Sequence, residues 1–165
     1  MTVIDQLLEN NSRYADGFDK GDLPLPPACN LAVVACMDAR LDVHKILGIS
    51  EGDAHVIRNA GGVVSDDAIR SLVISQRLLG TTAIVLIHHT DCGMLTFRDD
   101  DVKDAIEADT GLRPSFSMEA FGNLEQDVRQ SISRIQANPF IPNKDQVRGF
   151  VYDCATGRLN EVSSN

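Results

Sequence analysis

Short runs of apolar residues recur along the chain and predict the strands of a buried sheet. Residues 31–35 (LAVVA), 54–58 (AHVIR) and 83–87 (AIVLI) are mostly aliphatic. Continuous apolar runs of this length are typical of strands that are covered on both faces, as in a parallel sheet. Residues 149–152 predict a fourth strand, and residues 158–162 predict a fifth at the edge.

Between these runs, apolar residues recur every three or four positions, which predicts helices. Residues 41–47 and 67–79 show this pattern, and Gly80 is placed to end the second helix. A longer helix is expected from about Met118 to Ala137, before Pro139. Its core-facing stripe comprises Met118, Phe121, Leu124, Val128, Ile132 and Ile135. Strands that alternate with helices indicate an α/β fold, with about four parallel strands, an antiparallel edge strand and flanking helices.

The N-terminal residues differ from this core. Thr2, with Asp5 three residues later, is expected to cap a short amphipathic helix. Its apolar face carries Val3, Ile4, Leu7 and Leu8. Three closely spaced prolines indicate that residues 15–29 are a connector. We therefore expect a single domain, with an N-terminal arm and connector (1–29) followed by the α/β core (30–165).

Composition excludes several classes of function. The 165 residues include 15 Lys and Arg against 24 Asp and Glu, which gives a net charge of −9, with 5% aromatic residues and no Trp. Nucleic-acid binding requires clustered cations or stacking rings, so this composition argues against it. The longest apolar run, residues 31–37, is shorter than the roughly 20 residues that span a membrane.

The first residues lack the basic start and the apolar stretch of a secretory signal, so we expect a cytoplasmic protein. In a reducing compartment, cysteines indicate metal binding or catalysis rather than disulfides, although their number alone does not decide between these roles. The chain has four: Cys29, Cys36, Cys92 and Cys154.

Polar and reactive side chains directly follow three of the predicted strands. These clusters are residues 36–40 (CMDAR), 59–62 (NAGG) and 88–93 (HHTDCG). The carboxyl ends of parallel strands meet at one edge of a sheet, where ligands bind in α/β proteins. We expect the three clusters to lie together there, with the glycines forming a strand-to-helix turn.

Cys36, His89 and Cys92 form the clearest candidate site. Two thiolates and an imidazole suit zinc, and a catalytic zinc ion keeps three protein ligands and an open fourth position. The alternatives are ordinary buried cysteines and a closed structural zinc site with a fourth protein ligand. Cys29 and Cys154 lack polar neighbours in the sequence and close spacing to the other two, so we expect both in the core.

Asp38 and Arg40 flank the first candidate ligand. A neighbouring guanidinium keeps a carboxylate ionised and orients its oxygens. Such an aspartate can accept a hydrogen bond from a water or hydroxide on the metal, or it can occupy the fourth position itself. Without a metal nearby, the same two residues would form a surface ion pair of small consequence.

The motifs C-x-D-x-R (Cys36, Asp38, Arg40) and H-x-x-C-G (His89, Cys92, Gly93) resemble the β-class carbonic anhydrases. Residues 30–98 are similar to this family, and the length is similar to its short bacterial-type members. The resemblance implies one Zn²⁺ per chain, held by the two cysteines and the histidine. It implies hydration of CO₂ to bicarbonate and a proton by a zinc-bound hydroxide, which Asp38 orients while Arg40 holds Asp38.

The resemblance also implies a homodimer or tetramer, with the first helix as an arm that packs on the partner. Many family members have Gly where this chain has His88, which leaves substrate preference open. The absence of Trp favours water as the fourth zinc ligand. His44 and His88 are proton-shuttle candidates only by their proximity in the chain, and Val63 and Val64 are candidates for an apolar pocket wall.

Two other functions remain as alternatives. The first is a zinc-dependent hydrolase of COS or CS₂, because relatives of the same fold use the same metal-bound nucleophile on those linear molecules. The second is a non-catalytic bicarbonate or redox sensor, whose thiols would react with oxidant rather than hold a metal.

Overall fold

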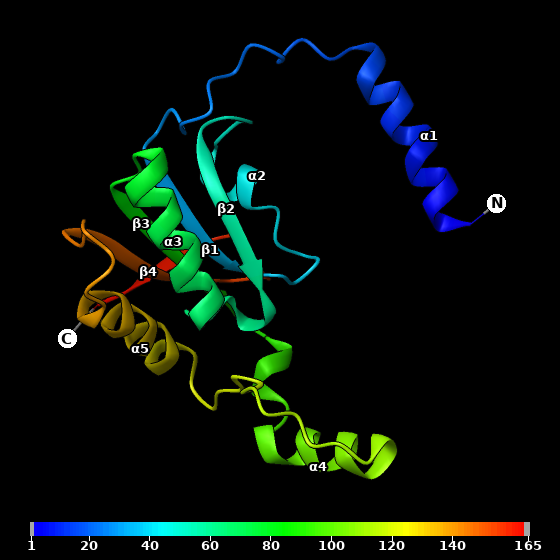
Figure 1. The fold of residues 1–165 in the computed structure, drawn as a ribbon, viewed down its shortest axis with the longest axis vertical. Helices are drawn as coiled ribbons and strands as arrows, with labels where there is room; N and C mark the ends of the chain where they lie inside the picture. Colours follow the sequence, from blue (N-terminus) through cyan, green and yellow to red (C-terminus); the bar gives the residue numbers. More distant parts are fainter. Residues whose placement is uncertain (1, 164–165) are drawn as a thin grey trace.

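A five-stranded sheet in the order β2-β1-β3-β4-β5 forms the centre of the protein in this computed structural model, which describes residues 2–163 (Figure 1). The strands are β1 (Leu31–Cys36), β2 (Ala54–Asn59), β3 (Ala83–His89), β4 (Gln146–Tyr152) and β5 (Leu159–Val162). The first four are parallel, and β5 runs antiparallel to β4 at the edge. This arrangement confirms the α/β fold with a mainly parallel sheet.

Two helices, α3 (Asp66–Leu79) and α5 (Leu124–Ala137), cover one face of the sheet (Figure 1). The Ser65 side chain accepts a hydrogen bond from the amide of Ala68 and caps α3, and Gly80 ends that helix in a left-handed conformation. The aliphatic core between sheet and helices includes Val34, Leu72, Ile84, Leu86, Val128 and Ile132. This core holds the strands in place, and it thereby fixes the positions from which the loops at the strand ends begin.

The opposite face carries the short helix α2 (Val43–Leu47) and a second apolar cluster. Its Asp42 side chain accepts a hydrogen bond from the amide of Lys45, so the helix begins two residues later than predicted. Cys36 and Cys92 lie in this second cluster, beside Ile87. The candidate metal ligands therefore occupy the face of the sheet that α3 and α5 leave uncovered.

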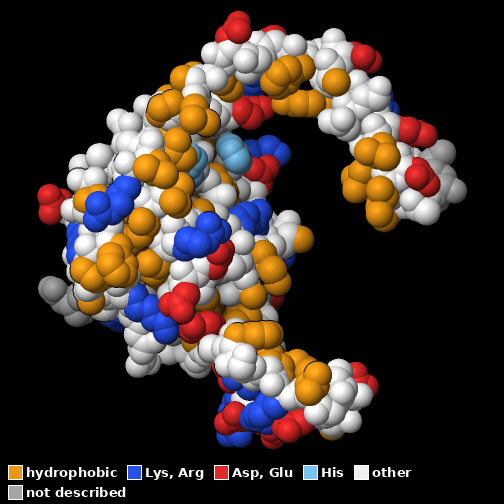
Figure 2. Space-filling view, in the orientation of Figure 1, with side chains coloured by type: hydrophobic (Ala, Val, Ile, Leu, Met, Phe, Trp, Pro, Cys, Tyr) orange, Lys and Arg blue, Asp and Glu red, His pale blue; other side chains and the backbone are white. Residues whose placement is uncertain are grey.

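The N-terminal helix α1 (Val3–Asp16) projects away from the sheet on an extended connector (Figure 1). Thr2 and Asp5 exchange the hydrogen bonds of a capping box, which confirms the predicted start of the helix. None of the residues from Val3 to Asp16 is buried, although the helix is amphipathic. Figure 2 shows apolar side chains gathered on the concave side of this arm.

The long helix predicted over residues 118–137 is wrong at its start. Asn123 caps α5 by accepting a hydrogen bond from the amide of Gln126 at 2.9 Å, so residues 118–122 lie outside the helix. Glu119 adopts a left-handed φ of 61°, which a continuous helix excludes. Apolar residues at helical spacing were not sufficient to predict this boundary, because a polar cap within the pattern determines it.

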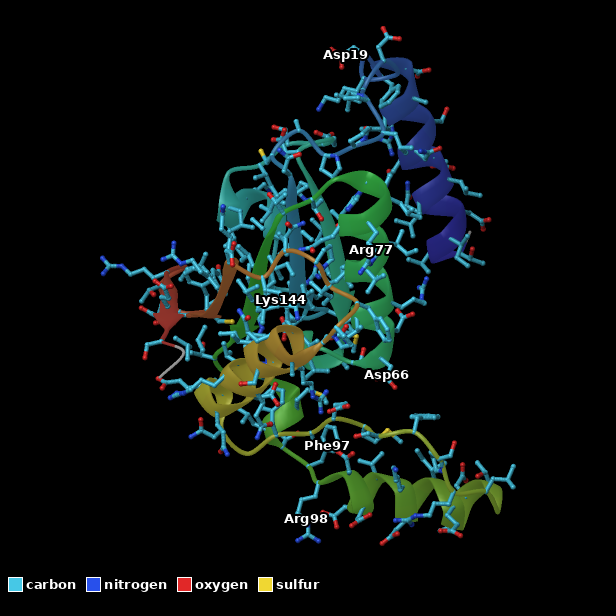
Figure 3. All side chains as sticks on the ribbon, turned by 60° about the vertical axis from the view of Figure 1, so that its left-hand side comes forward. Asp19, Asp66, Arg77, Phe97, Arg98 and Lys144 are labelled. Atoms are coloured by element: carbon cyan, nitrogen blue, oxygen red, sulfur yellow. The ribbon has the colours of Figure 1, made fainter. Side chains whose placement is uncertain are left out.

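Helix α4 (Asp99–Thr110) was not predicted, since its sequence is acidic and its apolar stripe is limited to Val102, Ala105 and Ile106. It projects from the sheet, and Figure 3 shows Phe97 and Arg98 where the chain leaves for it. The Asp99 carboxylate accepts hydrogen bonds from three successive amides, those of Met118, Glu119 and Ala120. The first residue of α4 thus fixes the loop that leads to α5.

The turn after β2 packs directly on the two strands that carry candidate ligands. Gly62 has a left-handed φ of 67°, and a Cβ there would lie 2.7 Å from the Cys36 nitrogen and 2.8 Å from the Ile87 oxygen. The glycines therefore make the predicted strand-to-helix turn and also allow close approach of two backbones.

We expect Gly62→Ala to destabilise the protein by about 2–4 kcal/mol, because the methyl group meets rigid backbone in a conformation that disfavours side chains. Gly80→Ala is a matched control, since Gly80 has a φ of 76° but no neighbour within 4 Å. The control is expected to lose about 1–2 kcal/mol. Urea unfolding of both variants measures the difference, and equal losses would contradict this interpretation.

Candidate metal centre

Three predicted ligands meet at the carboxyl edge of the sheet. Cys36 ends β1, His89 ends β3, and Cys92 follows in the next turn. One donor atom from each lies within 4.8 Å of the other two, and all three residues are buried. Parallel pairing of Ala35 with Ile87 places the ends of β1 and β3 side by side, which brings together residues far apart in the sequence.

The His89 ring is oriented by the backbone of the next residue, Thr90. Its Nδ1 donates a hydrogen bond to the Thr90 carbonyl at 2.7 Å, and its Nε2 lies 3.3 Å from the Cys36 sulfur. A hydrogen bond from one ring nitrogen to a carbonyl fixes the tautomer and leaves the other nitrogen free as a metal ligand. Nε2 is therefore the nitrogen that faces the two sulfurs.

The donor set fits a zinc ion. The two sulfurs lie close together, and their interaction lowers the pKa of Cys36 and raises the pKa of Cys92. One sulfur is therefore held as a thiolate, the form that binds metal. Two sulfurs and one imidazole nitrogen match the ligand types that zinc prefers.

The expectation that both remaining cysteines lie in the core is wrong for Cys29, whereas Cys154 packs against the second apolar cluster. Cys29 is exposed, whereas Cys154 is half-buried with its sulfur 3.6 Å from Nδ1 of His89 and 3.5 Å from the Thr90 carbonyl. Cys154 thus lies beside the histidine nitrogen that faces away from the other two sulfurs. This position excludes it as a fourth ligand in the present arrangement.

Asp38 lies beside the ligands and is held by Arg40. The Arg40 side chain donates from Nε to Oδ1 and from Nη2 to Oδ2 of Asp38, both at 2.9 Å. These hydrogen bonds hold the pKa of Asp38 well below its ordinary value. Oδ2 lies 3.6 Å from Nε2 of His89, so an ionised carboxylate faces the centre of the three ligands.

Two further polar residues, which the sequence analysis did not identify, support this arrangement. Arg58 of β2 donates to the Cys36 carbonyl at 2.8 and 3.0 Å and to the Asp38 carbonyl at 2.8 Å. Asp91, in the turn between His89 and Cys92, accepts hydrogen bonds from Arg40. The signal that could have identified Arg58 is a charged side chain at the end of a mostly apolar run, residues 54–58.

A small hollow of about 330 Å³ opens beside the ligands and Asp38. Apart from these polar groups, its wall is mainly apolar and includes Met37, Ala60, Gly61, Met94 and Phe97. Val63 and Val64 are buried and do not belong to this lining, so the prediction that they form the wall is wrong. An apolar wall next to one charged acceptor suits a small uncharged molecule.

The two proton-shuttle candidates differ in their surroundings. His88 is fully buried, and its Nε2 lies 2.6 Å from an Asp127 oxygen on α5. Since successive side chains of a strand point to opposite faces, His88 faces α5 while His89 faces the ligands. His88 therefore points away from the candidate ligands, and His44 lies exposed on α2.

The comparisons with known proteins agree with this geometry. The sequence model of a family described as carbonic anhydrase matches residues 31–159. Beta-carbonic anhydrase 1 of Mycobacterium tuberculosis is 63% identical to this chain over 163 residues, which cover 99% of each protein. The chain belongs to the β-carbonic anhydrase family. The resemblance inferred from its motifs is thereby confirmed.

Structures of the family have the same fold. The crystal structure of carbonic anhydrase from Streptococcus mutans matches this β-carbonic anhydrase family member with a TM-score of 0.92 and 41% identity, and the match covers 99% of each chain. A protein named carbon disulfide hydrolase, from Acidithiobacillus thiooxidans, is 37% identical over 92% of this chain and 84% of its own length. Among residues 2–163, no helix has the length and apolar character that a membrane crossing requires.

We expect purified protein to contain about one zinc ion per chain and Cys36→Ser to lose it, because the site would keep only two strong ligands. Cys29→Ser is the matched control, since Cys29 is exposed and lies outside the ligand group. Metal analysis by mass spectrometry measures the zinc content. Zinc-free wild-type protein with a disulfide between Cys36 and Cys92 would instead support a redox sensor.

Proposed function

We propose that this chain catalyses the reversible hydration of CO₂ to bicarbonate and a proton, with one zinc ion held by Cys36, His89 and Cys92. The observation that carries this proposal is the convergence of the three buried donor atoms next to an ionised Asp38. Membership of the β-carbonic anhydrase family and the high identity to a protein of that name support it further.

When bound, zinc supplies a Lewis acid that lowers the pKa of a coordinated water to about 7. The protein contributes the orientation of the attacking water. Asp38 is ionised and can only accept hydrogen bonds, so it directs a water proton toward itself and an oxygen lone pair toward the substrate. Arg40 occupies both carboxylate oxygens on one side, which prevents rotation of the acceptor.

The wall of the hollow accounts for binding of CO₂. Met94, Phe97 and Ala60 present apolar surface to a linear molecule without charge. Bicarbonate is an anion, and the Asp38 carboxylate next to it favours its release by charge repulsion. The site thus combines weak apolar binding of the substrate with electrostatic expulsion of the product.

We expect Asp38→Ala to retain zinc and to lower kcat for CO₂ hydration by about 10²–10³-fold, because the acceptor that orients the nucleophile is lost. Stopped-flow hydration, with zinc quantified on the same sample, measures both properties. Asp67→Ala, which removes an exposed carboxylate paired with Arg70, is the control and should leave the rate unchanged. A near-normal rate in the Asp38 variant would remove this residue from the mechanism.

Wild-type protein also distinguishes the proposed reaction from hydrolysis of COS or of CS₂, the second of which is the substrate in the name of the Acidithiobacillus relative. Turnover of CO₂, COS and CS₂ is compared on one zinc-quantified sample. We expect CO₂ to be the preferred substrate. Inert behaviour toward CO₂, together with turnover of COS or CS₂, would overturn the proposal.

We also propose that the chain forms at least a homodimer, in which α1 packs on the partner. The apolar face of this helix supports the proposal, because Ile4 and Leu8 are each 65% exposed although they belong to one stripe with Leu7. An apolar face of this kind is usually covered in solution.

Sedimentation velocity is expected to show a dimer or tetramer for wild type and a shift toward the monomer for Leu7→Asp, which places a charge on the apolar face. Arg13→Asp places a carboxylate on the opposite side of α1 from Ile4, Leu7 and Leu8, and it should leave the assembly intact. A stable species of 18.0 kDa for wild type would contradict the proposal.

A further inference from the structure

Two edges of the Arg40 guanidinium are occupied, and two different loops supply the acceptors. Nε and Nη2 donate to the two Asp38 oxygens on the loop after β1, each at 2.9 Å. Nη1 donates to the Asp91 carboxylate and Nη2 to the Asp91 carbonyl, also at 2.9 Å each. A planar guanidinium held on two edges has one orientation, whereas one held on a single edge can pivot about that edge.

Asp91 has a distinctive place in the chain. It lies between His89 and Cys92, in a turn where its φ is 54°, within the left-handed region. Its contacts therefore connect Arg40 to the same short turn that carries two of the three metal ligands. Without Asp91, Asp38 alone would hold the guanidinium, and Asp38 lies in the same loop as Arg40.

We propose that Asp91 is a positioning residue for CO₂ hydration, which acts through Arg40 to fix the Asp38 carboxylate relative to His89 and Cys92. This inference rests on the proposed function. The Asp38 carboxylate is oriented by Arg40, and Asp91 sets the position of Arg40 from the opposite loop. Asp91 itself touches neither the donor atoms nor the wall of the hollow.

The exposure of Asp91 separates this role from a contribution to stability. Its side chain is 86% exposed, and exposed ion pairs contribute little to the free energy of folding. The left-handed backbone of the turn is tolerated by Gly and by Asn. Both residues can therefore replace Asp91 without strain, and they differ in whether an oxygen remains for Nη1.

The first test compares Asp91→Gly with Asp91→Asn. The glycine variant keeps the backbone acceptor and loses the carboxylate, so we expect kcat to fall about tenfold with little change in KM and with zinc content unchanged. The asparagine variant keeps an uncharged oxygen for Nη1 and should recover most of the loss. Asp67→Asn, at an exposed ion pair on α3, is the matched control and should retain full activity.

The second test observes Arg40 directly and does not depend on turnover. In ¹⁵N-labelled, zinc-loaded protein, the Nη protons of Arg40, identified by their loss in Arg40→Lys, should be sharp and distinct because rotation is restricted. We expect Asp91→Gly to broaden the Nη1 signals and Asp91→Asn to preserve them. Should wild type fail to hydrate CO₂, the proposed function is wrong, while these spectra still decide whether Asp91 holds Arg40.

Three outcomes would overturn the inference. One is a glycine variant whose kcat stays within about twofold of wild type, below the loss expected for a supporting hydrogen-bond partner. Another is loss of zinc from the glycine variant, which would assign Asp91 to the turn itself. The third is a set of Arg40 signals that the substitution does not change.

Discussion

The parallel pairing of β1 with β3 is the constraint on which the site depends. Cys36 and His89 come from distant parts of the chain, and only the register of these two strands places their side chains within reach of one ion. Gly62 presses its backbone against both strand ends, so that the turn after β2 closes over this junction. The aliphatic core beneath α3 and α5 keeps the register fixed, because a slipped strand would expose its apolar side chains.

Around the candidate ligands, cationic and anionic side chains are paired at short range, whereas the chain as a whole has an excess of acidic residues. A net charge of −9 would not attract an anion, and at physiological salt most of it is screened beyond about 8 Å. Near the site, Arg40 and Arg58 hold the backbone and carboxylate of the loop after β1. The cations thus serve to fix acceptors in place, and the bulk acidity contributes to solubility.

The sequence was informative wherever one physical signal dominated. Aliphatic runs predicted β1, β2 and β3, and shorter apolar segments indicated β4 and β5. The spacing of Cys36, Asp38, His89 and Cys92 predicted which side chains converge. It was less informative where two signals compete, as at Asn123, whose cap interrupts an apolar stripe that continues on either side. Contacts such as Arg40 with Asp91 and Cys154 with His89 join separate loops, so that only the folded chain reveals them.

The buried contact between His88 and Asp127 has a consequence for transplanting this site to another scaffold. Because His88 is fully buried beside the candidate ligand His89, a scaffold that covers this strand with an apolar helix would leave its Nε2 without an acceptor, at a cost of about 1–3 kcal/mol. A graft of this site should therefore include the first turns of α5 together with the end of β3. A minimal graft of the three ligands with their loops would omit the support that lies behind the sheet.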